Sequence, residues 1–236
     1  MQQFFIDHLV SVGDEYVFTK EQKHHAKTVV RLENEIVRLV YDGKGFYAKA
    51  YTKGDDFVAE VIEEDTIDRE LPIHFVLAVA LIRKEKFELV LQKACELGVT
   101  EIIPFTSKRC VVQAKKDKSD RYNQILKQAA EQCKRDRVPV IRDVIDIKDL
   151  HLYKQECNLL AFEKENIKGN KLHDVIQNQQ SIMVVIGPEG GFEQNEVDAL
   201  MNDDFNCISL GRRILRAETA AMYACAIVSE MTERAQ

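Results

Sequence analysis

The residues best suited to chemistry in this chain lie in two glycine-bearing segments near its C-terminus. Residues 187–191 (Gly-Pro-Glu-Gly-Gly) carry one carboxylate, Glu189, and residues 211–219 (Gly-Arg-Arg-Ile-Leu-Arg-Ala-Glu-Thr) carry three arginines and a second carboxylate, Glu218. Glycines let a backbone approach a ligand closely, and guanidinium groups bind phosphates or the polar edge of a base. The two segments therefore indicate a site for a polar or charged ligand.

Each segment taken alone also has a plainer interpretation. Proline and glycines at 187–191 suit a tight turn between a strand and a helix, with Glu189 facing water. Ile214 and Leu215 either tuck beneath their loop as core or form walls around a flat aromatic group such as adenine. Residues 187–191 match neither the P-loop nor the dinucleotide-binding glycine pattern. The residues alone leave the ligand open.

Both segments directly follow apolar runs of strand length. Strands that open into glycine turns before helices place those turns at the carboxyl edge of a sheet, where α/β proteins bind ligands. Strands alternate with helices from residue 73 onward, which predicts a mostly parallel α/β sheet. The predicted strands are 73–82, 100–105, 139–144, 158–162, 181–186 and 207–210, and the predicted helices are 84–97, 121–135, 172–177, 193–201 and 217–230.

The first seventy residues read differently, as a β-rich domain. Residues 35–41 alternate apolar and polar types, and two further strands, at 46–52 and 57–62, follow after glycine turns, which predicts a small barrel. One helix is expected at 20–31, with Thr19 as its N-cap and Gln22 completing a capping box. An acidic stretch at 63–70 suggests a boundary between domains at 1–70 and 71–236.

Composition fits an ordinary globular chain. The 236 residues are 45% hydrophobic and 31% charged, which is normal for a protein with a real core. No apolar run approaches the roughly 18–20 residues of a membrane span, and the N-terminus lacks the pattern of a signal peptide. The six cysteines lack the short spacing of a zinc site. We therefore expect a cytoplasmic protein with no membrane partner and no metal.

Charge is distributed unevenly along the chain. The net charge is −6, yet residues 108–142 hold eleven Lys and Arg against four acidic residues. A concentrated basic face binds phosphates whatever the total charge, although most charge runs are solvated helix faces. The best candidates for phosphate contacts are Arg109, Lys115, Lys116, Arg135 and Arg137. A second group, on the helix of the first domain, is either RNA-binding or one core histidine with a solvated face: His24, His25, Lys27 and Arg31.

Several segments together resemble the bacterial 16S ribosomal RNA uracil-N3 methyltransferase family, which belongs to the knotted SPOUT methyltransferases. The match runs in order over nearly the whole chain, through residues 24–32, 42–45, 92–104, 129–139, 186–192 and 210–220. It implies an α/β protein with an N-terminal PUA-like β-barrel and a C-terminal SPOUT domain containing a deep trefoil knot. It also implies S-adenosylmethionine as cofactor, a homodimer, and 16S ribosomal RNA in the small ribosomal subunit as substrate.

The same resemblance implies roles for individual residues. For the chemistry itself, our own hypothesis is that Arg216 stabilises charge on the uracil carbonyls and that Glu189 or Glu218 accepts the N3 proton if burial raises the pKa of that carboxyl. Ile214 and Leu215 pack on the adenine. The implied cofactor-binding residues are Phe162, Glu163, Gly187, Pro188, Glu189, Gly190, Gly191, Leu210, Gly211, Ile214, Leu215 and Arg216.

The chain departs from the pattern of this family at two places. Glu193-Gln194 stands where the family often has Ser-Pro, so the helix start loses a good cap, and Arg212 stands where proline is common.

Two rival functions remain. One is a SPOUT enzyme acting on another RNA site, such as a ribose 2′-oxygen, whose Asn-Ser-Leu-Asn-Val-Ser signature is absent here. The other is a non-catalytic RNA-binding module, which the intact glycines and Arg216 disfavour.

Overall fold

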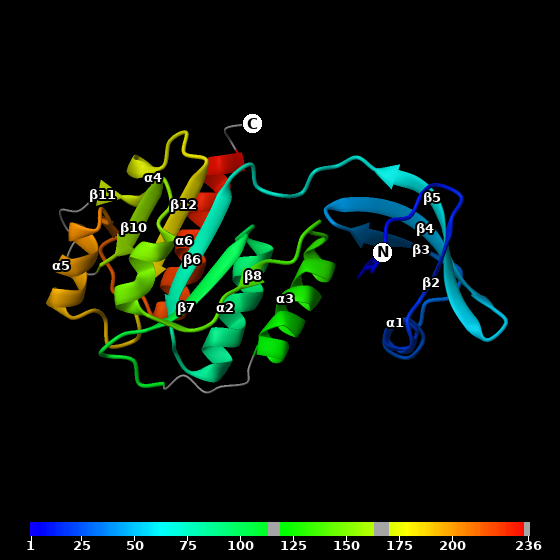
Figure 1. The fold of residues 1–236 in the computed structure, drawn as a ribbon, viewed down its shortest axis with the longest axis horizontal. Coiled ribbons are helices and arrows are strands. Elements are labelled where there is room, and N and C mark those ends of the chain that lie inside the picture. Colours follow the sequence, from blue (N-terminus) through cyan, green and yellow to red (C-terminus); the bar gives the residue numbers. More distant parts are fainter. Residues whose placement is uncertain (113–118, 163–169, 234–236) are drawn as a thin grey trace. The chain divides into compact units, whose positions relative to one another are not determined.

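The structure is a computed structural model that describes residues 1–112, 119–162 and 170–233. The chain forms two compact units (Figure 1). Unit 1 comprises Met1–Glu70 together with Ala130–Arg137, and unit 2 comprises Leu71–Ala129 together with Val138–Gln236. The first unit therefore includes, besides the β-rich first seventy residues, a short segment from the middle of the chain.

Unit 1 is built on a five-stranded sheet with the order β1-β3-β4-β5-β2. β1 runs parallel to β3, and the other neighbours are antiparallel. Because β1 and β2 are the two edge strands and do not pair with each other, the expected closed barrel is not found among the described strands. The strands are β1 (Gln2–Phe5), β2 (Glu15–Val17), β3 (Glu35–Tyr41), β4 (Lys44–Lys53) and β5 (Asp56–Asp65).

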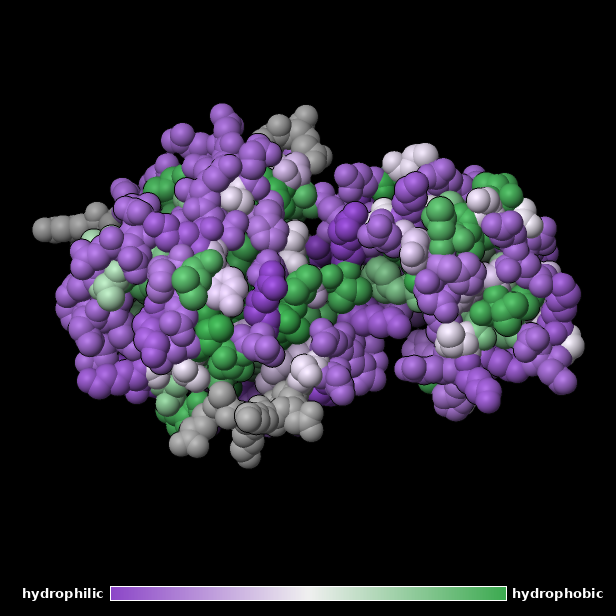
Figure 2. Space-filling view, in the orientation of Figure 1, coloured by the Kyte–Doolittle hydropathy of each residue, from purple (hydrophilic) through white to green (hydrophobic). Residues whose placement is uncertain are grey.

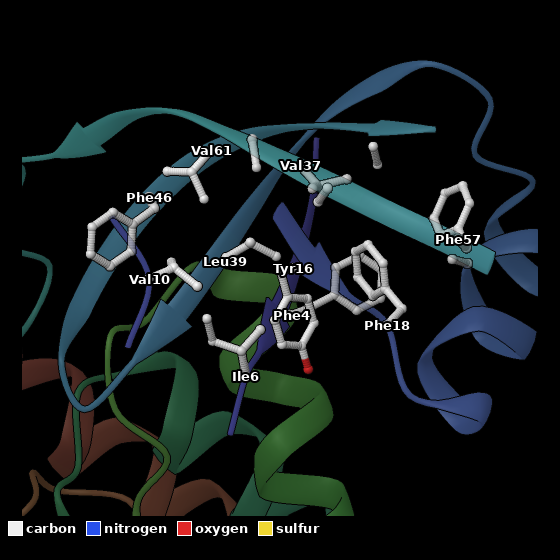
Figure 3. Close-up of a cluster of buried hydrophobic side chains, with 14 of the residues drawn as sticks. Phe4, Ile6, Val10, Tyr16, Phe18, Val37, Leu39, Phe46, Phe57 and Val61 are labelled. Carbon is white, nitrogen blue, oxygen red and sulfur yellow. The ribbon is translucent and has the colours of Figure 1, made fainter. Parts of the chain in front are cut away.

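Aromatic side chains from several strands fill the core of unit 1 (Figure 3). Phe18 packs edge-on against Phe4 with ring centroids 4.9 Å apart, and it contacts Phe57 at 5.1 Å. Tyr16 is buried as well and donates a hydrogen bond to Gln22 Oε1 at 3.0 Å. The apolar positions of the alternating strands thus meet in one cluster, as their period of two predicts.

The single predicted helix of unit 1 is present but changes its winding. Thr19 caps α1 (Lys20–His24) in a capping box with Gln22, as predicted. The chain then continues as a π-helix, η1 (His25–Val30), and ends at Arg31 in the left-handed conformation with φ 60°. A complete π-turn is rare and departs from the regular helix expected at 20–31.

A buried polar network, here called the Arg38 cluster, joins the strands of unit 1 to its segment 130–137. The Arg38 guanidinium is fully buried and donates to Asp65 at 2.6 Å, to Gln3 Oε1 at 2.9 Å and to Asp136. Because its three nitrogens all meet acceptors, the buried charge is compensated. Gly45 leaves the space that the guanidinium occupies, since a Cβ there would collide with it.

Unit 2 contains a parallel sheet with the order β11-β13-β10-β12-β6-β7-β8, and β9 also pairs with β7. The last long strand, β13, lies beside β10 although β12 separates them in sequence. The strands are β6 (His74–Ala80), β7 (Glu101–Thr106), β8 (Val140–Ile141), β9 (Ile145–Asp146), β10 (Cys157–Ala161), β11 (Asn170–Lys171), β12 (Ser181–Ile186) and β13 (Asn206–Ser209). The mostly parallel α/β sheet predicted from the sequence is confirmed.

Helices flank this sheet (Figure 1), so its central strands are apolar on both faces. On one face, alternate residues of β6 such as Val76 and Ala78 pack with Val197 and Leu200 of α5. On the other face α6 packs against β6, β12 and α2. The helical elements are α2 (Lys84–Glu96), α3 (Ser119–Cys133), η2 (Ile147–Tyr153), α4 (Leu172–Val175), α5 (Gln194–Asn202) and α6 (Ala217–Glu233).

The face of the molecule shown in Figure 2 is largely hydrophilic. In the face shown in Figure 2, hydrophobic side chains form separate small patches on both units, which is ordinary for a globular protein. None of the helices in the described ranges has the length and apolar character needed to cross a bilayer.

Candidate functional site

A cavity of about 350 Å³ opens in unit 2 where β10, β12 and β13 end. Its volume lies in the range of about 300–1,000 Å³ that is typical of small-molecule sites. The end of β10, the loops that follow β12 and β13, and the start of α6 form it, at the carboxyl edge expected for a parallel sheet. The lining residues are Ala161, Phe162, Ile186, Gly187, Pro188, Glu189, Gly190, Gly191, Phe192, Leu210, Arg213, Ile214, Leu215, Arg216, Ala217 and Ala220.

The loop after β12, residues 187–191, is tightly turned. Gly191 adopts φ 69° and donates its N–H to the Pro188 carbonyl at 2.9 Å. Gly187 is needed for another reason, because a Cβ there would lie 2.8 Å from the Phe192 ring. Phe192 is buried beneath the loop and stacks near Phe105 with ring centroids 6.4 Å apart. The loop is thus held from below by an aromatic pair.

The loop after β13 presents apolar and cationic groups to the same cavity. Gly211 adopts φ 110° and donates its N–H to Ser209 Oγ at 3.1 Å, which bends the chain directly after the strand. Ile214 is 84% exposed although it lines the cavity. An apolar side chain this exposed gains free energy if a ligand covers it. Arg213 and Arg216 are exposed in the same loop.

Lys86, at the start of α2, lies close to two carboxylates of the site, one in α6 and one in the loop after β12. Its ammonium lies 3.1 Å from Glu218 Oε1 in the first turn of α6 and 4.0 Å from Glu189 Oε1 in the loop after β12. Glu218 is buried, and its Oε2 is the one buried side-chain polar atom of the described residues without a hydrogen-bond partner. Buried polar atoms are normally paired, so this oxygen is an unusual feature beside the cavity.

The ionisation of Glu218 differs from the expectation of a raised pKa. Burial does oppose ionisation, but its own backbone N–H, the Lys86 ammonium and the nearby Arg216 guanidinium outweigh it and lower the pKa of the Glu218 carboxyl. The start of α6 adds a favourable helix dipole. Glu218 is therefore an anion at neutral pH, and it does not line the cavity, whereas Glu189 does.

The predicted cofactor residues largely converge. All five residues 187–191, together with Phe162, Leu210, Ile214, Leu215 and Arg216, line one cavity. Gly211 shapes its loop without lining the cavity. Glu163 lies outside the described residues. Within those residues, no group of three or more His, Cys, Asp or Glu is placed to hold a metal ion.

The predicted RNA-binding residues do not form one group. Arg135 is 4% exposed and binds Glu70 at 3.0 Å through Nε, so it serves the interior of unit 1 and its expected phosphate contact is wrong. Arg137 is exposed and lies 3.5 Å from Asp42. Arg109 is bound to the loop after β12. Lys115 and Lys116 lie outside the described residues.

The histidine-bearing helix of unit 1 keeps an exposed basic face. His24, Lys27 and Arg31 are exposed. His25 is half-buried, and its ring centroid lies 6.4 Å from that of Phe4. The two interpretations of this helix therefore combine, because one histidine touches the core while its neighbours face solvent.

Sequence reasoning missed Lys86 and expected Arg109 to contact phosphate instead of the loop after β12. Lys86 and Arg109 follow β6 and β7, whose carboxyl ends lie at the same sheet edge as the cavity, and this position is the signal that points to them. Arg213 is one of the three arginines expected to bind phosphate or a polar base edge, and it lines the cavity. The expected weak start of α5 is also not found, since Glu196 Oε2 accepts the Glu193 N–H at 2.8 Å.

Comparison with known proteins agrees with this geometry. A family model described as an RNA methyltransferase domain matches residues 69–229. Ribosomal RNA small subunit methyltransferase E of Bacillus subtilis is 33% identical, over 99% of this chain and 98% of its own. The same enzyme from Neisseria gonorrhoeae, in a crystal structure bound to S-adenosyl methionine, is 29% identical with a TM-score of 0.88 and 98% of each chain covered.

A structure of a methyltransferase from Legionella pneumophila in complex with the bound cofactor SAM is 28% identical with a TM-score of 0.86, covering 97% of this chain and 96% of that chain. The relatives and solved structures thus agree over essentially the full length, and the family model covers residues 69–229. The resemblance found in the sequence motifs is confirmed: the chain belongs to the ribosomal RNA small subunit methyltransferase E family of S-adenosylmethionine-dependent RNA methyltransferases.

Proposed function

We propose that this protein transfers a methyl group from S-adenosylmethionine to N3 of a specific uridine in the 16S ribosomal RNA of the small ribosomal subunit. The observation that carries the proposal is the cavity at the ends of β10, β12 and β13, which joins apolar walls, glycine backbone and the Arg216 guanidinium. Structures of two relatives are described with this cofactor bound.

The residues of the cavity fit an adenosyl group with a charged amino-acid end. Ile214 and Leu215 supply apolar surface for the flat adenine, which would cover the exposed Ile214 side chain. The backbone of residues 187–191 and of Leu210 offers donors and acceptors at close approach, because the glycines lack side chains. Glu189 supplies a carboxylate within the wall.

The cofactor supplies an electrophilic methyl group on a sulfonium. The protein must hold uracil N3 in line with it. A bond forms between N3 and the methyl carbon as the carbon–sulfur bond breaks and its electron pair stays on sulfur. The N3 proton passes to a protein carboxylate and then to solvent, so the products are 3-methyluridine and S-adenosylhomocysteine.

Two side chains take the central roles in this proposal. Arg216 stabilises negative charge on the uracil carbonyls as N3 loses its proton. Glu189 is favoured as the proton acceptor over Glu218, because Glu189 lines the cavity, whereas Glu218 is held as a low-pKa anion by Lys86 outside the lining. A carboxylate with a lowered pKa is a weaker base.

Phosphate binding is proposed to involve unit 1, where the helix at residues 20–31 carries exposed basic side chains and Arg137 is exposed beside Asp42. N3 lies on the pairing edge of uracil, so the uridine must be unpaired or flipped out. On the family resemblance we further propose a PUA-like RNA-binding domain at 1–70, a trefoil knot in the domain at 71–236, a homodimer, no metal, and action in the cytoplasm.

The proposed knot rests on the family resemblance; in the sheet, β10 lies between β12 and β13, so the chain crosses β10 on its way from β12 to β13. Light scattering of the purified protein tests the dimer, where a mass near 54 kDa, twice the 27.1 kDa of the chain, is expected.

A methylation assay tests the reaction. Small ribosomal subunits lacking the modification, and naked 16S RNA beside them, are incubated with the protein and S-adenosylmethionine labelled in its methyl group. Label in 3-methyluridine is expected, and label only with subunits indicates that an assembled substrate is recognised. Label in a 2′-O-methyl nucleoside would instead favour another RNA site, and cofactor binding without any label would favour a binding module.

A further inference from the structure

Arg109 lies outside the cavity wall but is bound to the segment that forms it. Its Nη1 donates to the Gly190 carbonyl at 3.1 Å, and its Nε donates to Glu193 Oε1 at 2.7 Å. Gly190 lines the cavity, and Glu193 directly precedes α5. One guanidinium thus spans the two ends of the Gly190–Glu193 segment from its outer side.

Further hydrogen bonds connect the segment after β7, which carries Lys108 and Arg109, to the start of α5. Glu196, in the first turn of α5, accepts the Lys108 N–H on Oε1 and the Glu193 N–H on Oε2, both at 2.8 Å. The segment carrying Arg109 is itself a turn, closed by the Cys110 N–H on the Ser107 carbonyl at 3.1 Å. Arg109 is therefore part of a small hydrogen-bonded junction between the end of β7 and the loop after β12.

Close packing at Gly190 adds a second, independent constraint. A Cβ on Gly190 would lie 3.0 Å from Arg109 Cβ and 3.3 Å from the Arg109 carbonyl oxygen. The Arg109 residue therefore fills the space on the outer side of the loop, so the position of the loop depends on what residue 109 presents there.

Electrostatics keeps the junction charged at neutral pH. The hydrogen bond and charge of Arg109, with the charge of Lys108, lower the pKa of the Glu193 carboxyl. The Arg109 and Glu193 side chains are 47% and 28% exposed. Such a partly exposed pair adds little to global stability, so its larger consequence is the position of the loop.

We propose that Arg109 is a positioning residue for the S-adenosylmethionine loop rather than a ligand of an RNA phosphate. It holds the Gly190 carbonyl and Glu193 so that the 187–191 turn has its binding shape before the cofactor arrives, which lowers the cost of ordering it. The inference rests on the proposed function. The same guanidinium is engaged by protein acceptors, which leaves it less suited to phosphate binding.

The test is cofactor affinity measured by calorimetry on the full-length protein. Arg109→Ala is expected to raise the Kd for S-adenosylmethionine about tenfold, while its thermal midpoint stays within about 2 °C of wild type. Arg109→Lys restores only part of the affinity, because an ammonium cannot reproduce two donors in fixed geometry. Lys108→Ala is the matched control, since it removes an adjacent cation 3.7 Å from Glu193 and keeps the backbone bond to Glu196.

Kinetics and RNA binding separate the alternatives. In the methylation assay, Arg109→Ala should raise KM for the cofactor and leave kcat at saturating cofactor within about twofold of wild type. An unchanged cofactor Kd, with weaker RNA binding and a smaller salt dependence, would overturn the inference and make Arg109 a phosphate ligand. Failure of the wild type itself to bind the cofactor would overturn the proposed function first.

Discussion

The two units use arginine beside glycine in opposite ways. In unit 1, Arg38 is fully buried against Gly45, and its donors are taken by Asp65, Asp136 and Gln3. In unit 2, Arg216 is exposed at the cavity, and none of its side-chain nitrogens has a hydrogen bond to another described residue. The guanidinium donors of Arg38 are therefore fully hydrogen-bonded within the protein, whereas those of Arg216 are available to a ligand.

The difference shows how burial separates a structural arginine from a functional one. A buried guanidinium with complete partners cannot contact a ligand without breaking that network, and breaking it is costly. An exposed guanidinium in a cavity wall costs little to leave unpaired in water and gains partners when a charged ligand arrives. Arg135 belongs to the first kind, which is why its predicted phosphate contact is wrong.

The largest effect is expected from breaking the Arg38 cluster. Arg38→Ala leaves the Asp65 and Asp136 carboxylates facing an empty buried site, and should lower the free energy of unfolding by about 3–5 kcal/mol. Urea unfolding at pH 7 measures the loss. Lys49→Ala, which removes an exposed cation from β4, should stay within about 0.5 kcal/mol of wild type. An Arg38 variant as stable as the Lys49 variant would contradict the structural role.

Arg216→Ala, in contrast to Arg38→Ala, should reduce catalysis and leave the stability of the fold nearly unchanged. We expect kcat to fall by roughly 100-fold or more, the loss typical of a group that stabilises charge in the transition state, while the cofactor Kd changes less than about threefold. The free energy of unfolding should move by no more than about 0.5 kcal/mol. Steady-state methylation kinetics, calorimetry and urea unfolding measure the three quantities.

Arg212→Ala serves as the control for that variant, because Arg212 is exposed in the same loop but does not line the cavity. Equal losses of turnover and cofactor affinity in Arg216→Ala would remove the proposed role in charge stabilisation.

The Arg38 cluster should also make the stability of unit 1 sensitive to acid, through the Asp65 carboxyl. Burial opposes ionisation of Asp65, but hydrogen bonds from Arg69 and Arg38 lower its pKa to about 2 from a usual 3.8. A depressed pKa means that the stabilisation is complete above pH 4 and is lost as pH falls toward 2, in total roughly 2 kcal/mol. Unfolding of wild type and Asp65→Asn from pH 7 to pH 2 should therefore show a gap that narrows below pH 4. A constant gap would exclude this linkage.

Much of the fold follows from sequence pattern alone. Residues 181–186 form the strand predicted for them, and Thr19 with Gln22 forms the predicted capping box, because both signals are local. The grouping of 187–191 with 214–216 also follows, since parallel strands bring their carboxyl ends to one edge.

Other features depend on contacts that no local pattern encodes. The association of 130–137 with unit 1 arises from Arg38 and Gln3, which bind the Asp136 carboxylate and the Arg135 carbonyl from far away in sequence. Lys86 gives no signal by its type, and its pairing with Glu218 arises only from the packing of α2 on α6. The π-turn at His25–Val30 likewise has no period distinct from an ordinary helix in so short a stretch.

The smallest expected effect compares two glycines with the same local geometry. Gly211, beside the cavity, and Gly13, in unit 1, have φ of 110° and 92°, and at either position a Cβ would meet no heavy atom within 4 Å. Alanine at either position therefore introduces backbone strain alone, about 1–2 kcal/mol. Gly211→Ala should also weaken cofactor binding about tenfold, because relief of that strain moves the loop that carries Leu215 and Arg216. Gly13→Ala should lose similar stability and bind the cofactor as wild type does. Calorimetric Kd values that change equally in both variants would show that global strain, and not the shape of the cavity loop, controls cofactor binding.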